Sequence, residues 1–398
     1  MSQREGAARS DARAGGGEIL LMVAAILPLA VTPVAITMQP GMVQGMVDFF
    51  GFTQPEAGFV VSAEVFGIMA GAIGFAIVGG RVSWRWALFA GLILTIAANL
   101  VCIVRNDYAS MLALRAVAGL GGGLAAAIGW NVLAQGRDPS RGFGWGTAAI
   151  ILFAAGGFAL LSTLFALGGY SAFLLAFSIA VAACLPLALV VRRRAPAEEA
   201  SAEAPARGGG WSAPGALSLL SILVFSAAFT MAWTYMSLVG HDAGLEGPAI
   251  AQVFSLTQFF GVAGALSMAA VGAAFGFSRP AVVVLGAGAV AIAALTVLSS
   301  LAAFFAANAV FQFTWNAGIP IVLGVIAVRS LGGALFRLAV PLQFVGMAAG
   351  PSLAALLLDG EDYSLVVWTS AGLLIVSLLA LVPLILVRPP SAEPASGP

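Results

Sequence analysis

Twelve apolar stretches of roughly twenty residues, separated by polar turns, constrain this chain more than any other feature. A helix needs about 20 mostly apolar residues to cross a bilayer. The sequence therefore predicts an all-α membrane protein with twelve transmembrane helices. We expect them near the following bounds: Ile19–Gln39, Ala57–Gly79, Trp86–Val104, Ala109–Ala134, Phe143–Leu167, Ser171–Val191, Pro214–Gly240, Ala249–Phe275, Ala281–Leu301, Ala303–Val328, Leu331–Leu358 and Leu365–Val387.

The composition excludes several classes of protein. Only 9% of the residues are charged and 61% are hydrophobic, whereas a soluble domain has about 25% charged residues. The net charge is zero and lysine is absent, which argues against a nucleic-acid partner and against an ATP-binding phosphate loop. The only histidine is His241, so we expect no metal site and no other cofactor. No constellation of catalytic side chains indicates an enzyme.

The charges of the loops predict the orientation in the membrane. Fourteen of the seventeen arginines lie in the terminal segments and in the loops of one side, the exceptions being Arg105, Arg115 and Arg337. Basic loops remain in the cytoplasm. We therefore expect a multi-pass protein of the bacterial inner membrane, embedded in lipid, monomeric, and with both termini cytoplasmic.

One long polar connector divides the chain into halves. It is rich in Arg, Ala, Pro, Glu and Gly, and it follows the sixth apolar stretch. The expected organisation is a disordered cytoplasmic tail, a six-helix bundle, a cytoplasmic linker, a second six-helix bundle and a short tail, over 1–17, 18–191, 192–211, 212–388 and 389–398.

The two halves also resemble each other. Glu64 and Gln258 are separated by 194 residues (258 − 64), and Arg115 and Asn308 by 193 (308 − 115). Both Arg115 and Asn308 are followed by Ala-Val. Such weak internal symmetry is typical of transporters that bind substrate at the midplane between two bundles.

Three local motifs give the chain a resemblance to the major facilitator superfamily of secondary transporters, over nearly its whole length. They are Gly80-Arg81-Val82-Ser83-Trp84-Arg85 after the second stretch, Arg115-Ala-Val-Ala-Gly119 in the fourth, and Arg137-Asp138-Pro139-Ser140-Arg141-Gly142 before the fifth. The first departs from the family pattern, since Gly80 replaces an acidic residue and Ser83 a glycine. The resemblance implies two pseudo-symmetric bundles and a cytoplasmic gate that includes Arg81 and Arg85.

Glu64 and Arg115 are the principal candidates for proton coupling. Glu64 is the only acidic residue within any apolar stretch, and Arg115 lies in another. Charges at this depth are costly and usually face a partner or a water-filled path. Glu64 can carry a proton with Arg115 as its partner, and Arg115 can attract an anionic substrate. The alternative is a permanent structural ion pair.

Further candidates for substrate binding are Gln258, Gln312, Trp315 and Arg337. Two arginines facing one site, Arg115 and Arg337, would favour a carboxylate, because guanidinium groups bind carboxylates bidentately. The alternatives are that Arg337 only reaches the cytoplasmic interface and that the amides bond neighbouring helices.

The sequence therefore predicts a secondary transporter, not an enzyme, that moves a small organic solute by alternating access. We expect the solute to be a small molecule such as a carboxylate anion and the coupling ion to be a proton. One alternative is an exporter of amphipathic drugs. Another is a receptor or scaffold that has the fold but transports nothing.

Overall fold

The protein is described by a computed structural model over residues 2–136, 138–191, 213–275, 278–297, 300–329, 334–358, 360 and 362–386. Within these ranges, the side chains of residues 2–16, 139–140, 213–214, 268–275, 327–329, 334–337, 384 and 386 are outside the description. The expected linker 192–211 and the expected tail 389–398 also lie outside the described residues. The first helix begins at Ser2, within the stretch where we expect a disordered tail.

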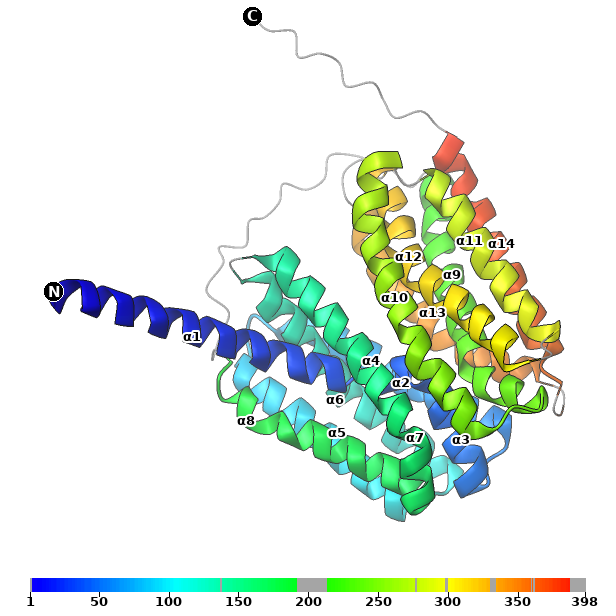
Figure 1. The fold of residues 1–398 in the computed structure, drawn as a ribbon, viewed down its shortest axis with the longest axis horizontal. Helices are drawn as coiled ribbons and strands as arrows, with labels where there is room; N and C mark the ends of the chain where they lie inside the picture. Colours follow the sequence, from blue (N-terminus) through cyan, green and yellow to red (C-terminus); the bar gives the residue numbers. More distant parts are fainter. Residues whose placement is uncertain are drawn as a thin grey trace, which may run out of the picture.

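The described chain folds into two helical bundles (Figure 1). The first bundle contains α1 Ser2–Val31, α2 Val34–Thr37, α3 Gln39–Phe50, α4 Gln54–Val78, α5 Trp84–Val104, α6 Tyr108–Ala134, α7 Pro139–Ala183 and α8 Leu185–Ala188. The second contains α9 Ala213–Asp242, α10 Gly247–Phe275, α11 Ser278–Ala294, the 3₁₀ helix η1 Leu295–Val297, α12 Leu301–Arg329, α13 Ala334–Leu357 and α14 Ser364–Leu386.

The count of spans follows from a reversal within α7. Its backbone leaves the helical conformation at Gly168 and Gly169, and Gly169 has a φ of 62°, which glycine adopts without steric cost. Among the described residues, ten helices are long and apolar enough to cross a membrane, α7 among them. With α7 counted as two spans and α1 to α3 as one interrupted span, the described chain has twelve. The expected all-α membrane fold is confirmed.

The first span is longer than the sequence predicts. We expect it to end at Gln39, whereas the chain breaks near Pro33, resumes in α2, and continues through α3 to Phe50. A proline lacks the N–H group that would bond the preceding turn. It interrupts the helix here but does not end the membrane crossing.

Glycines allow two pairs of helices to pack closely. A Cβ atom on Gly67 or Gly71 of α4 would overlap backbone carbonyls of α6, and one on Gly119 of α6 would overlap the carbonyl of Glu64. In the second bundle, a Cβ on Gly346 of α13 would overlap the carbonyl of Leu223 on α9. Small residues at such spacing are typical of membrane helix pairs.

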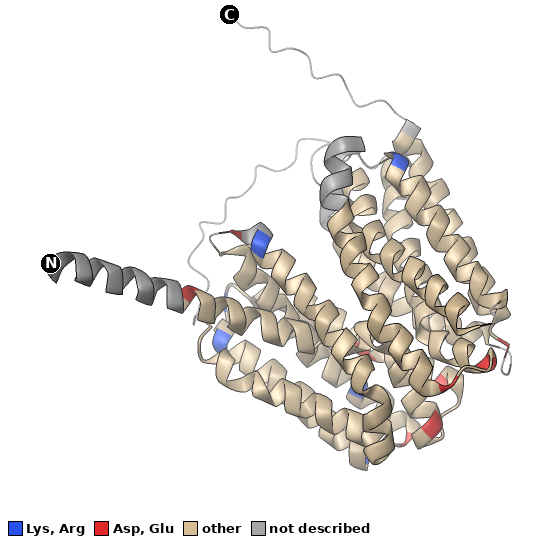
Figure 2. Ribbon diagram, in the orientation of Figure 1, with Lys and Arg blue, Asp and Glu red and all other residues tan. Residues whose placement is uncertain are grey.

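The two bundles diverge from one end toward the other. We call the end where α8 finishes and α9 begins the linker end, and the end with the α3–α4 and α9–α10 connections the distal end. Figure 1 shows the bundles closest at the distal end and separating toward the linker end. Acidic residues gather at the distal end in Figure 2. Asp107 and Glu246 lie in described connections there, and Asp242 ends α9.

Candidate functional site

Glu64 and Arg115 form an ion pair in the interior of the first bundle. Glu64 on α4 is 1% exposed and Arg115 on α6 is fully buried. The Arg115 Nε atom donates to Glu64 Oε2 at 2.8 Å, and Nη2 donates to the same oxygen. The Nη1 atom of Arg115 donates to Oδ1 of Asn99 on α5. Three helices therefore contribute to one buried polar cluster, which we call the Glu64 cluster.

The Glu64 cluster lies on the opposite side of α4 from the second bundle. Ser62, two residues before Glu64, bonds the Ala348 carbonyl and the Ser352 hydroxyl of α13. Two residues correspond to about 200° around a helix. The Glu64 side chain therefore points into its own bundle, and in this conformation Arg115 faces Glu64 and Asn99.

Gln258, Gln312 and Trp315 lie in the second bundle. Gln258 is on α10 and the other two are on α12, and all three side chains are buried. Among the described residues, the side-chain amides of Gln258 and Gln312 have no hydrogen-bond partner. Asn308, the counterpart of Arg115 in the second half, is also fully buried on α12 and donates to the Phe304 carbonyl. The internal symmetry therefore places polar groups at matching depths in both bundles.

An aromatic cluster surrounds Trp315. Its indole stacks on Phe229 at 5.8 Å between ring centroids and meets Trp233 at 6.2 Å and Phe311 at 5.7 Å. Trp233 also contacts Phe158 of the first bundle at 5.9 Å. Trp233 is not among the candidates predicted from the sequence. Its only signal there is the pair of aromatic residues, Trp233 and Tyr235, on either side of a threonine in an apolar span.

Six side-chain hydrogen bonds join the two bundles in the described part of the chain, and all six lie on the distal half. Two connect α4 to α13 through Ser62. The others are Thr234 to Gln39 Oε1 (3.3 Å), Tyr235 to the Gln54 carbonyl (3.0 Å), Ser237 to Gln44 Oε1 (3.3 Å) and Ser255 to the Ala155 carbonyl (2.8 Å). We call this set the distal contacts. They hold the bundles together at one end only.

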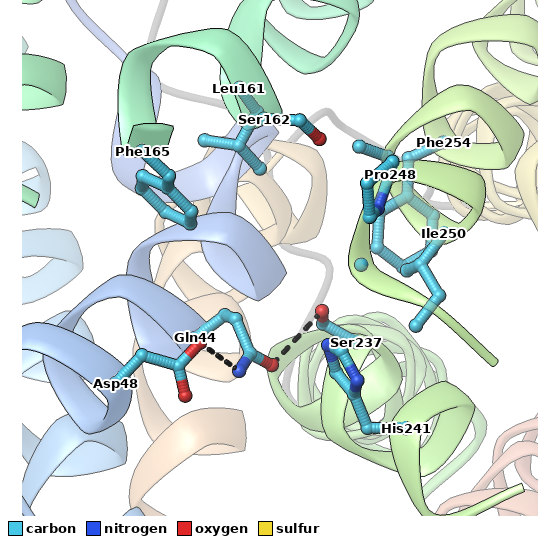
Figure 3. A pocket seen from close by; sticks show the side chains of 12 residues that line it. Gln44, Asp48, Leu161, Ser162, Phe165, Ser237, His241, Pro248, Ile250 and Phe254 are labelled. Carbon is cyan, nitrogen blue, oxygen red and sulfur yellow. Dashed lines mark hydrogen bonds between the residues drawn. The ribbon is translucent and has the colours of Figure 1, made fainter. Parts of the chain in front are cut away.

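A pocket of about 180 Å³ lies beside the distal contacts. Figure 3 shows its polar side, where Gln44 bridges Asp48 and Ser237, with His241 adjacent. Its apolar side includes Phe165 and Phe254. Both bundles line it, so its shape depends on how they are placed relative to each other. No three His, Cys, Asp or Glu side chains gather as metal ligands would, within the part of the chain described.

The expected gate residues lie at the linker end. Arg81 is exposed in the α4–α5 connection. Arg85 is half-buried, and its Nε donates to the Val191 carbonyl at 3.2 Å. This bond attaches the first turn of α5 to the last described residue of the first bundle. The Arg337 side chain lies outside the described residues.

The two helical bundles, the membrane-spanning length of their helices and the buried polar groups define a polytopic membrane transporter of small molecules. The chain belongs to the Major Facilitator Superfamily, whose sequence pattern it matches over residues 20–336. The family resemblance inferred from the three motifs is thereby confirmed.

Solved structures of the same fold include the nucleoside transporter NupG and a point mutant of it. The mutant superimposes with a TM-score of 0.74 at 12% identity, covering 92% of this chain and 99% of its own. The unmutated protein gives 0.72 at 13%, covering 94% and 100%. A search of curated proteins found no match. At this identity the likeness concerns the fold alone.

Proposed function

We propose that this protein is a secondary transporter that moves a small organic solute across the bacterial inner membrane by alternating access. The observation that carries the proposal is the one-sided placement of the distal contacts. Hydrogen bonds join the bundles on the distal half, while the bundles diverge toward the linker end (Figure 1). This is the arrangement expected of a carrier closed to one side, which opens there when the bundles rock.

The linker end is proposed to face the cytoplasm. Arg81 lies in a described connection at this end, and Arg85, Arg141 and Arg279 lie in the first turns of the helices that begin there. Basic residues at the ends of spans remain cytoplasmic. In this orientation the structure corresponds to an inward-facing state. The protein is proposed to act as a monomer, since each chain already contains both bundles.

A disulfide across the distal contacts tests the alternating-access proposal. The Ser62 and Ser352 hydroxyl oxygens are 2.6 Å apart, close enough for cysteines there to form a disulfide. In a background with Cys102→Ala and Cys184→Ala, oxidation of Ser62→Cys/Ser352→Cys should abolish solute flux, and reduction should restore it. Each single cysteine variant is the control. Undiminished flux in the oxidised double variant would contradict a rocking mechanism.

The coupling ion is proposed to be a proton carried by Glu64. Arg115 donates two hydrogen bonds to Glu64 and one to Asn99. The Asn99 oxygen therefore remains as an acceptor for Arg115 when Glu64 takes up a proton. Glu64→Gln should therefore abolish pH-driven accumulation while part of the solute exchange continues. Unchanged proton-driven uptake by this variant would remove Glu64 from the mechanism.

An uncharged solute is favoured over a carboxylate. Binding a carboxylate at Arg115 would require the guanidinium to leave Glu64 and Asn99. The aromatic contacts between the bundles instead consist of phenyl and indole groups, those of Phe158, Trp233 and Phe254. Trp315, Gln258 and Gln312 add uncharged groups that are buried in the second bundle. NupG transports nucleosides, which are uncharged ring compounds of this kind. Arg115→Ala should then impair anionic and neutral solutes equally, whereas selective loss of anions would restore the carboxylate proposal.

Two rivals remain testable in proteoliposomes. An exporter of amphipathic drugs would move lipophilic cations such as tetraphenylphosphonium in preference to neutral solutes. A receptor or scaffold would bind a ligand and give no flux.

A further inference from the structure

Trp233 lies where the two bundles meet near the middle of the membrane. Its ring centroid is 5.1 Å from that of Phe254 on α10 and 5.8 Å from that of Phe311 on α12, and it also contacts Phe158 of the first bundle. It is nine residues from the end of α9, which corresponds to about 14 Å of helix. The hydrocarbon core is about 30 Å thick, so Trp233 lies close to the midplane.

Gln39 approaches the same place from α3. It is fully buried, and its Oε1 accepts a hydrogen bond from Thr234, the residue after Trp233. Trp233 contacts Phe158, Phe254 and Phe311, and Gln39 bonds the residue next to Trp233. We call these five residues, Gln39, Phe158, Trp233, Phe254 and Phe311, the junction.

Two buried donors in the junction have no acceptor. The indole Nε1–H of Trp233 and the amide Nε2–H₂ group of Gln39 are both shielded from solvent and unpaired in the described chain. Buried polar groups are nearly always hydrogen-bonded, because an unmade bond is costly. Two unpaired donors among aromatic rings would suit a flat, apolar molecule that carries hydrogen-bond acceptors.

The surroundings of these donors also indicate that such a molecule is uncharged. None of the junction residues is charged, and the Arg115 guanidinium is paired with Glu64 on the opposite side of α4. A charged ligand would be desolvated here without a counter-ion, which is strongly unfavourable. Phe254 belongs both to the junction and to the wall of the distal pocket, so the junction borders space already present between the bundles.

We infer that the junction is the solute subsite, and that it takes an uncharged planar ring bearing hydrogen-bond acceptors, which receive bonds from Trp233 and Gln39. The ring lies beside the stacked pair of Trp233 and Phe311. This inference rests on the proposed transport function and specifies the chemical class of its solute.

Binding to the purified full-length protein tests the inference. The neutral probes are uracil, uridine and theophylline, each a planar ring with carbonyl acceptors. Orotate, which is uracil with a carboxylate, tests charge at constant ring shape, and toluene tests a ring without acceptors. We expect at least one neutral probe to bind more tightly than orotate and toluene. Binding of orotate or tetraphenylphosphonium in preference to every neutral probe would overturn the inference.

Two variants test whether the Trp233 and Gln39 donors bind the solute. Trp233→Phe keeps an aromatic ring and removes the N–H, and Gln39→Met keeps the length of the side chain. Each should weaken the binding probe by about two- to tenfold, the equivalent of one neutral hydrogen bond. The matched control is Trp368→Phe, whose side chain is 58% exposed on a lipid-facing helix, and it should bind as the wild type does.

A structural role gives a different result. In Gln39→Met the Thr234 hydroxyl keeps its 2.6 Å bond to the Thr230 carbonyl, and an unpaired donor disappears. The thermal stability of the unliganded variant should therefore not fall. Lower stability with unchanged probe affinity would make Gln39 a structural residue and refute its role in binding.

Flux measurements separate this inference from the proposed function. Wild-type flux of a probe whose affinity is the same in both donor variants would leave transport standing and refute the junction. Probe binding that depends on the donors, with no flux in proteoliposomes, would support the junction and refute transport.

Discussion

The Glu64–Arg115 pair gives a prediction whose size follows from its burial. Both side chains are almost completely buried, and Glu64 has no other described partner than Arg115. Removing one member of such a pair leaves an uncompensated charge and costs about 3–5 kcal/mol. Glu64→Leu and Arg115→Met should each lower the free energy of unfolding by about that amount.

The double variant should recover most of the loss. Replacing both charges with apolar side chains of similar length removes the desolvation penalty together with the attraction. Asn99 then loses the donor to its Oδ1, while its Nδ2 already lacks a partner. An unsatisfied amide costs about 1–3 kcal/mol. We therefore expect Glu64→Leu/Arg115→Met to be about 1–3 kcal/mol less stable than the wild type.

Unfolding in mixed micelles, titrated with SDS and followed by tryptophan fluorescence, gives the three free energies. Ser178→Ala is the control, because the Ser178 hydroxyl is equally buried but bonds only the Leu174 carbonyl of its own helix. Single variants that lose less than about 1 kcal/mol, or a double variant that loses the sum of the two, would refute the reasoning. Additivity would mean that the two side chains do not interact.

Three further predictions concern the backbone and a helix terminus. Gly119→Val should destabilise the protein by at least about 1–3 kcal/mol through overpacking against α4, whereas Gly74→Ala, which meets no atom within 4 Å, should not; equal losses would contradict close helix contact as the cause. Gly169→Ala should cost about 1–3 kcal/mol, because its φ of 62° and ψ of −149° strain an L residue and the new Cβ would lie 2.6 Å from the ring of Phe49; an unchanged melting temperature would contradict both causes. Asp107 accepts hydrogen bonds from Ser110, which lower the pKa of its carboxyl group. The stabilisation by Asp107 should be present above the unfolded pKa of about 3.9 and disappear as pH falls through the folded pKa. Asp107→Asn should therefore make the melting temperature less dependent on pH in that range.

The bilayer makes the helical architecture predictable from the sequence. A backbone that cannot bond water in lipid must form helices, so apolar length alone located the spans, and Gly168-Gly169 marked the reversal between the fifth and sixth. The first span was misjudged for a physical reason. Gln39 and Gln44 look like the end of a span, but they are buried because their side chains bond Thr234 and Ser237 of the other bundle.

The polar clusters were only partly predictable. Glu64 and Arg115 were recognisable because charges are rare in apolar stretches, and their pairing was one of the expected possibilities. Asn99, which completes the cluster, is an ordinary amide in an apolar run, and nothing in its local sequence points at Arg115. Gln39 bonds Thr234, the residue next to Trp233, across 195 residues of sequence (234 − 39), and no local pattern predicts such a contact.

The distal contacts also determine which conditions can shift the balance between open and closed states. Every one of them, in the part of the chain described, joins a hydroxyl to a neutral oxygen, and the single described ion pair lies within one bundle. Dissolved salt screens charges but has little influence on such bonds. If the chain is the carrier that we propose, a lock of neutral groups should let it cycle at similar rates in fresh and saline surroundings.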